Sequence, residues 1–249
     1  MKTKHRGSRK HILNWIGHPG FVDQLNSLLY AGVIVDATRD HWMPTAKDDT
    51  EARLDKPRGK HLLPDPAIGD HLAEWWLVHR RGANTPNWDL ASTCRINDTP
   101  GIVLVEAKAN VPELTMSGKA LYYADNERSR ANHIRIGEAI EEARDYLDRI
   151  IPGVCISRDS HYQLSNRVAF AWKLASFGVP VVLMYLGFIG DEGIRDAGEP
   201  FESEAHWQHV MGEHMRAVLP EGFVERDIPC GKAGFRMIVR ARPVIEVSQ

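Results

Sequence analysis

The stretch Gly101-Ile-Val-Leu-Val-Glu106-Ala-Lys108 decides the fold, because an apolar run in it ends in two opposite charges. Residues 102–105 show no polar alternation, which predicts a central strand covered on both faces. Side chains of a strand alternate with period two, so Glu106 and Lys108 project to one face and Ala107 to the other. Two charges on a buried strand are costly to desolvate unless they are paired or engage a ligand. This pair is therefore the first candidate for a functional site.

A second strand is expected just before this one. Residues 88–96 and 101–107 flank Asn97-Asp-Thr-Pro-Gly101, a turn signal that predicts two antiparallel strands. Asp89 would then lie across from Glu106. Two carboxylates form an oxygen-rich cluster that suits Mg²⁺ or Mn²⁺, which need only one or two carboxylates with water and a substrate phosphate. Lys108 could stabilise phosphate charge or hold an attacking water.

These residues resemble the signature of the PD-(D/E)xK nuclease superfamily, which includes many restriction endonucleases. The matching text is Pro86-Asn-Trp-Asp89 and then residues 101–108, with the proline three residues before the aspartate instead of directly before it. The resemblance implies an α/β fold with a restriction endonuclease-like core, a mixed central β-sheet flanked by α-helices, usually in the order helix, three strands, helix, strand. It also implies Mg²⁺-dependent hydrolysis of phosphodiester bonds, with Mn²⁺ as a substitute. Asp89 and Glu106 would be metal ligands, and Lys108 the electrostatic and water-positioning group.

The same resemblance implies two supporting residues. The superfamily often takes an acidic residue from the first helix, where Glu74 would be a further metal ligand and Asp70, one turn earlier, is its competitor. The RecB-like nucleases carry a glutamine on a later helix, which here contains Gln163, and Arg167 on the same helix could meet a phosphate. The structural alternatives are an ordinary exposed carboxylate and an ordinary helix glutamine.

The remaining elements are predicted from apolar spacing. Helical periodicity indicates helices over 21–30, 66–81, 136–150, 161–177 and 204–218, and apolar runs indicate strands over 32–35, 179–186 and 234–240. Residues 42–66, rich in Pro, Asp, Lys and Gly, predict a long surface loop. We expect one α/β domain, with an N-terminal embellishment over 1–65, the nuclease-like core over 66–190 and a C-terminal extension over 191–249.

Composition limits the partners only weakly. A formal net charge of −2 gives no sign of a polyanion-binding protein, so a nucleic-acid partner must be argued from the site. The sequence predicts a soluble cytoplasmic protein without membrane contact. It has three cysteines without a CxxC pair, no apolar run behind the basic N-terminus and no membrane-spanning stretch.

The basic residues from Lys2 to Lys10 indicate a solubilising tail or an arm that touches phosphates. His206, His209 and His214 lack a partner ligand set and are interpreted as ordinary helix positions.

Several alternatives remain at the level of function. DNA is the expected nucleic acid and RNA the alternative, and the resemblance allows a homodimer because many double-strand cutters of the superfamily act as dimers. The principal rival function is a non-cleaving nucleic-acid-binding or assembly module on the same scaffold. A second rival is an unrelated carboxylate-dependent hydrolase. For Glu106 and Lys108 themselves, the rival is an ion pair with a purely structural role.

Overall fold

A mixed β-sheet organises the computed structural model, which describes residues 5–45 and 50–245 and has seven strands in these ranges. The strand order is β1-β3-β4-β5-β7-β6, and β2 also pairs with β3. The hairpin of β3 (Leu90–Ile96) and β4 (Thr99–Lys108) is antiparallel, whereas β5 (Val181–Ile189) lies parallel to β4 and to β7 (Gly234–Pro243). Three short strands pair antiparallel at its borders: β1 (Val33–Ile34), β2 (Trp42–Met43) and β6 (Asp227–Pro229).

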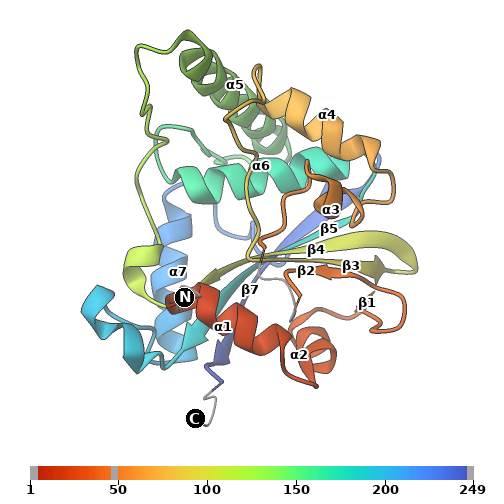
Figure 1. The fold of residues 1–249 in the computed structure, drawn as a ribbon, viewed down its shortest axis with the longest axis vertical. Coiled ribbons are helices and arrows are strands. Elements are labelled where there is room, and N and C mark those ends of the chain that lie inside the picture. Colours follow the sequence, from red (N-terminus) through yellow and green to blue (C-terminus); the bar gives the residue numbers. More distant parts are fainter. Residues whose placement is uncertain (1–4, 46–49, 246–249) are drawn as a thin grey trace.

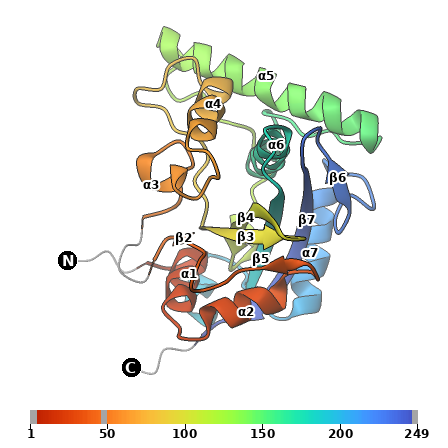
Figure 2. The same cartoon turned by 90° about the vertical axis from the view of Figure 1, so that its right-hand side faces the viewer.

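Helices cover both faces of this sheet (Figure 1, Figure 2). One face carries α4 (Ala67–Trp76), α5 (Glu127–Ile150), α6 (Tyr162–Ser176) and α7 (Glu204–Arg216), whereas the other carries α1 (Gly7–Ile16) and α2 (Phe21–Leu28). The predicted α/β fold with a mixed central sheet flanked by α-helices is confirmed. Within the described ranges, no helix has the length and apolarity needed to cross a membrane.

The two layers of helices explain the apolar run in β4. Ile102 and Leu104 belong to the core under α4, α5 and α6, while Val103 and Val105 belong to the core under α1 and α2. All four side chains are fully buried, which confirms the prediction of a strand covered on both faces. The same alternation turns the side chains of Glu106 and Lys108 toward the α6 face.

The turn between β3 and β4 is tighter than predicted. Only Asn97 and Asp98 connect the strands, and their φ angles of 47° and 64° are those of the two-residue turns that match the twist of a hairpin. Thr99, Pro100 and Gly101, which the sequence assigned to the turn, already pair within β4. The register places Leu90 opposite Val105, so one further step places Asp89 opposite Glu106.

Two segments differ from their predictions because buried apolar residues organise them. The predicted tail contains α1 from Gly7 onward, since Ile12 and Trp15 are fully buried against the sheet; residues 1–4 lie outside the described ranges. The predicted loop over 42–66 contains β2 and the short helix α3 (Pro57–Lys60), with Leu54, Leu62 and Leu63 buried; residues 46–49 are not described. In α1 the buried Ile12, Trp15 and Ile16 stand at helical spacing, but the run is short; over 42–66 the apolar residues are too widely spaced to give a periodic signal.

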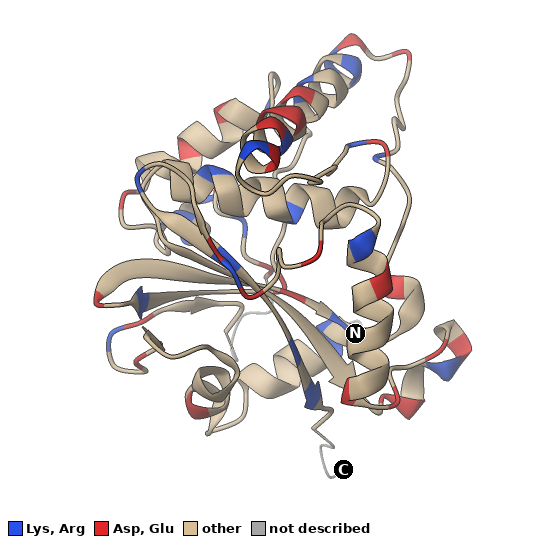
Figure 3. Cartoon of the chain, turned by 180° about the vertical axis from the view of Figure 1, so that it is seen from behind, with Lys and Arg blue, Asp and Glu red and all other residues tan. Residues whose placement is uncertain are grey.

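Helix bounds also differ at two places. The helix predicted over 66–81 ends at Trp76, because Leu77 takes an extended conformation with φ of −133°. The helix predicted over 136–150 begins earlier, at Glu127, where the side chain of Asn126 accepts a hydrogen bond from the Ser129 N–H and caps it. Figure 3 shows acidic and basic positions interleaved along α5, as expected for a helix with one solvated face.

Candidate active site

The ends of β3 and β4 place three ionisable side chains in one pocket of about 480 Å³. Asp89, Glu106 and Lys108 all line it, and Glu106 and Lys108 are only 2% and 4% exposed. The backbone N–H of Ala107 donates a hydrogen bond of 2.8 Å to Asp89 Oδ2, which fixes this carboxylate against β4. The structure therefore brings together the three residues that the strand pattern had singled out.

Both carboxylate oxygens of Glu106 accept bonds from cations. Lys108 Nζ donates to Oε1 at 2.6 Å, and Arg167 Nε on α6 donates to Oε2 at 2.6 Å. Two further contacts hold Arg167 in place. Its guanidinium lies 4.8 Å from the centroid of the Trp88 ring and donates a hydrogen bond to Asn166 Oδ1. Such charge-assisted bonds are what allow a carboxylate to remain ionised in a buried position.

The two carboxyl groups have opposite pKa shifts. Burial would raise the pKa of Glu106, but the charges and hydrogen bonds of Arg167 and Lys108 outweigh it, and the pKa is lowered. For Asp89, burial and the negative charge of Glu106 raise the pKa to about 7, against the weaker effects of Lys108, the Ala107 N–H and Arg167. Glu106 is thus ionised at neutral pH, while Asp89 is poised between its two forms.

Gln163 lines the same pocket from the first turn of α6, next to Tyr162 and Asn166. This is the position that the resemblance implied for a glutamine near the metal site. Its amide can donate and accept hydrogen bonds, so it can orient water or a phosphate oxygen beside the carboxylates. Arg167, for which the sequence suggested a phosphate contact, also faces the pocket.

Glu74 lies elsewhere. It is exposed on α4, where Arg80 donates to its Oε1 at 2.9 Å and His71 Nδ1 lies 3.6 Å from its Oε2. Its competitor Asp70 accepts a bond of 2.6 Å from Lys60, and neither acid lines the pocket of Asp89. The physical reason is that α4 turns Leu72, Trp75 and Trp76 into the core, which leaves Glu74 on the solvent side. This position corrects the expectation that Glu74 joins the metal ligands.

Three further charged residues line the pocket: Arg9, which the sequence indicated only as part of the basic segment from Lys2 to Lys10, and Glu51 and Glu113, which it did not indicate. Arg9 reaches the pocket from α1, and its guanidinium lies 3.8 Å from Glu51, a long contact for an ion pair. Glu113 is occupied with backbone, since its Oε2 accepts a bond of 2.9 Å from Ala109 N–H. No local pattern marks Arg9, because its approach to residues 51 and 89 depends on how α1 packs against the end of β4.

Two carboxylates of the pocket, those of Asp89 and Glu106, are the candidate ligands for a hard divalent cation. Within the described ranges no three His, Cys, Asp or Glu side chains are grouped so that they could hold a metal ion. Mg²⁺ binds through one or two carboxylates and keeps several waters, and Asp89 and Glu106 could supply those carboxylates.

None of the three histidines of α7, His206, His209 and His214, lines the pocket of Asp89. His206 lies 3.8 Å from Glu199, and the ring of His214 packs against that of His161 with centroids 4.9 Å apart. Burial and the charges of His161 and Lys108 lower the pKa of His214 to about 4.

A scan against family models and searches of curated proteins and of solved structures found no match to this chain. The site is therefore interpreted from its own chemistry.

Proposed function

We propose that this chain is a metal-dependent nuclease that hydrolyses phosphodiester bonds of nucleic acid, DNA in the first place, in the pocket of Asp89, Glu106 and Lys108. The observation that carries the proposal is the convergence of these three side chains with Gln163 and Arg167 in one pocket. Phosphoryl-transfer sites combine carboxylates that bind a metal ion with cationic side chains that bind the phosphate, and this pocket contains both kinds of group.

Each side chain then has a distinct role. Asp89 and Glu106 would hold Mg²⁺, or Mn²⁺ in its place, as a Lewis acid that polarises the phosphate. The ammonium of Lys108, fixed by its bond to Glu106, stabilises the negative charge that develops on the phosphate or holds the attacking water. Arg9 is available to bind a neighbouring phosphate, and Gln163 orients the water or the phosphate oxygen.

The order of elements supports a restriction endonuclease-like core in part. The chain runs through the helix α4, the antiparallel hairpin of β3 and β4, the helices α5 and α6, and then the strand β5, which is parallel to β4. The chain departs from the usual order at one place. Only two strands follow α4 before the next long helix, and the strand next to β3 at the edge of the sheet is β1, which precedes α4.

One observation favours a second function, a nucleic-acid-binding module that does not cleave. Both oxygens of Glu106 are already engaged by Lys108 and Arg167, as in a closed structural network. Asp89 weighs against this alternative. A purely structural network has no need of a second carboxylate whose ionisation is disfavoured, and burying such a group costs stability.

The experiment is a panel of end-labelled DNA and RNA, single and double stranded, incubated with the protein and Mg²⁺, Mn²⁺ or a chelator. We expect cleavage of at least one substrate with metal and none with chelator. The matched control is Glu74→Gln, which neutralises an exposed carboxylate outside the pocket and should cut at the wild-type rate. Binding without cleavage under every metal condition would replace the proposal by the second function, and cleavage that resists the chelator would contradict the metal site.

A further inference from the structure

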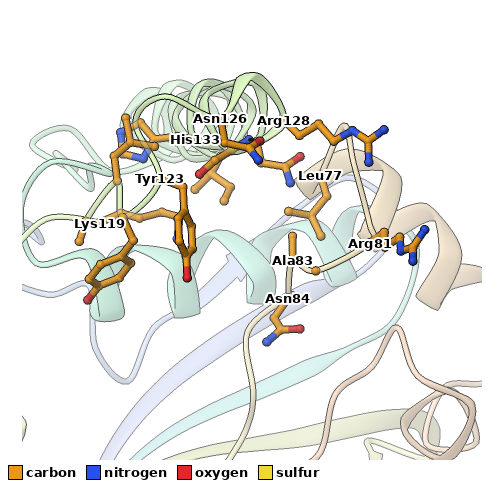
Figure 4. Close-up of a pocket in the computed structure, with 16 residues that line it drawn as sticks. Leu77, Arg81, Ala83, Asn84, Lys119, Tyr123, Asn126, Arg128 and His133 are labelled. Carbon is orange, nitrogen blue, oxygen red and sulfur yellow. Dashed lines mark hydrogen bonds between the residues drawn. The ribbon is translucent and has the colours of Figure 1, made fainter.

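A second pocket, of about 630 Å³, lies between the loop after α4 and the start of α5 (Figure 4). Its walls come from the loop after α4, from residues 119–123 and from the first half of α5. We call it the tyrosine–arginine pocket, after the side chains that distinguish it: Arg81, Tyr122, Tyr123 and Arg128.

The charge of this pocket is one-sided. Arg81, Lys119, Arg128 and His133 line it, and none of the described residues in its wall is acidic. Within the described ranges Arg81 and Arg128 have no ion pair, whereas the neighbouring Arg80 is neutralised by Asp70 and Glu74. A chain with a net charge of −2 thus gathers unpaired cations in one cavity, which attracts an anion.

His133 reports the same positive potential. Burial lowers its pKa, and the charges of Arg158 and Lys119 lower it further, against the opposing effect of Asp159. Burial is the largest cause of this shift, and the charges of Arg158 and Lys119 act in the direction expected beside a cluster of cations.

Two exposed aromatic side chains stand beside these cations. Tyr122 and Tyr123 are 86% and 73% exposed, although aromatic rings gain free energy by burial. Figure 4 shows the ring of Tyr123 in the pocket, with Lys119 on one side and Ala83 and Asn84 across from it. Arg81 and Arg128 lie across the pocket from Tyr123 (Figure 4). Exposed rings at one end and arginines at the other offer faces on which unpaired bases can stack and cations that can hold their phosphates.

The tyrosine–arginine pocket adjoins the candidate active site. Gly118 lines the pocket of Asp89, and the next residue, Lys119, lines the tyrosine–arginine pocket. The ammonium of Lys119 also lies 5.1 Å from the ring centroid of Tyr162, which lines the pocket of Asp89. A flexible strand can therefore run from one pocket into the other along residues 118–123.

We infer that the tyrosine–arginine pocket binds unpaired nucleotides of single-stranded nucleic acid and leads that strand to Asp89, Glu106 and Lys108. The inference rests on the proposed nuclease function for what happens to the strand, but the binding itself needs no cleavage. A single strand is the ligand because the faces of its bases are free to stack, whereas those of a duplex are already covered.

The test measures binding of a labelled oligothymidine by fluorescence anisotropy, with a chelator present so that no cleavage occurs. The double variant Tyr122→Leu/Tyr123→Leu should bind the oligothymidine about tenfold or more weakly than wild type, because leucine keeps apolar area but removes the stacking face. Tyr122→Phe/Tyr123→Phe keeps both rings and should bind within about twofold of wild type. In Arg81→Ala/Arg128→Ala, the negative slope of log affinity against log salt concentration should become shallower by about 1.4, since each phosphate contact on a single strand contributes about 0.7 to its magnitude.

The control is Arg226→Ala, which removes an exposed arginine from the segment between α7 and β6 and should leave the salt slope unchanged. Equal affinity of the wild type and the leucine variant for the single strand would overturn the inference, as would tighter binding of a matched duplex than of the single strand. These outcomes are separate from the cleavage panel. A protein that cuts nucleic acid and binds equally after loss of both tyrosines would overturn the inference and leave the nuclease proposal standing.

Discussion

Asp89 is the residue whose charged form, which the proposed function requires, makes the folded protein less stable. Its carboxylate lies against β4 beside a second carboxylate, and Lys108 and Arg167 both donate to Glu106 instead. The raised pKa means that the folded protein binds the Asp89 proton more tightly than the unfolded chain does. Groups that disfavour folding in this way are expected where a ligand completes the site.

This gives a stability prediction for Asp89→Asn. Between pH 3.8, the ordinary pKa of an aspartate, and about pH 7, the folded state binds more protons at Asp89 than the unfolded state does. The ionisation of Asp89 therefore destabilises the wild type progressively as pH rises through this window. The amide of asparagine removes the charge and still accepts the bond from Ala107. We expect the stability of the variant relative to wild type to rise from about pH 4 to about pH 7, by about 4 kcal/mol in total, when both proteins are measured in metal-free urea melts.

The control for this series is Asp98→Asn at the tip of the β3–β4 hairpin. Asp98 is fully exposed, and asparagine tolerates its positive φ, so the stability difference from wild type should not change with pH over the same window. An Asp89→Asn protein that is less stable than wild type at pH 8 would show that the charge on Asp89 is favourable, contrary to the raised pKa.

At the scale of elements, β4 and β5 position the lysine of the site. Lys108 pairs with Gly187 across these strands, and Gly187 leaves room for the buried ring of Trp207 on α7. A Cβ added at Gly187 would come within 2.4 Å of that ring, closer than real carbon atoms approach. The contact between α7 and β5 therefore requires a residue without a side chain.

Gly187→Ala should consequently destabilise the protein by about 1–3 kcal/mol, the usual cost of overpacking a core. Gly212→Ala on α7 is the matched control, because its Cβ would meet nothing within 4 Å and alanine is the better helix former. We expect the control to gain up to about 1 kcal/mol. The two changes should shift the urea midpoint in opposite directions, and a gain in stability for Gly187→Ala would refute the packing of α7 against β5.

The elements also show what the sequence can and cannot predict. The period of two in β4 is a local property, so Glu106 and Lys108 could be assigned to one face, and the turn residues Asn97 and Asp98 gave the partner strand. The apolar stripe of Leu72, Trp75 and Trp76 places Glu74 on the solvent side of α4, so helical spacing alone argued against this residue as a ligand. The sequence indicated Arg9 only as part of a basic segment, since only tertiary packing brings it to Glu51.

At the scale of the whole molecule, the net charge is a poor guide to partners. Acidic and basic positions alternate along α5 (Figure 3), and a net charge of −2 is a sum that conceals local excess. The tyrosine–arginine pocket gathers cations, whereas the pocket of Asp89 combines both signs within hydrogen-bonding reach. The composition gave no sign of a polyanion partner, and it could not show that Arg81, Lys119 and Arg128 lie together in one pocket.

Lys108 is the residue through which the proposed cleavage is most directly tested, because it can be removed without removing either proposed metal ligand. Arg167 remains bound to Glu106 in Lys108→Ala, so the buried carboxylate keeps a partner and the loss of stability should stay below the roughly 3–5 kcal/mol of a fully unpaired buried charge. The matched control is Lys173→Ala, which removes a partly buried, ion-paired lysine of α6 outside the pocket.

The deciding measurement is the rate of metal-dependent cleavage by Lys108→Ala, taken with its nucleic-acid affinity and melting temperature beside those of wild type and Lys173→Ala. If Lys108 stabilises the developing phosphate charge or positions the water, the rate should fall by about 10²- to 10³-fold. Binding should weaken far less, since one lysine–phosphate contact changes the salt slope by only about one unit. A folded Lys108→Ala protein that binds nucleic acid and cuts at the wild-type rate would contradict the assignment of this pocket as a nuclease site.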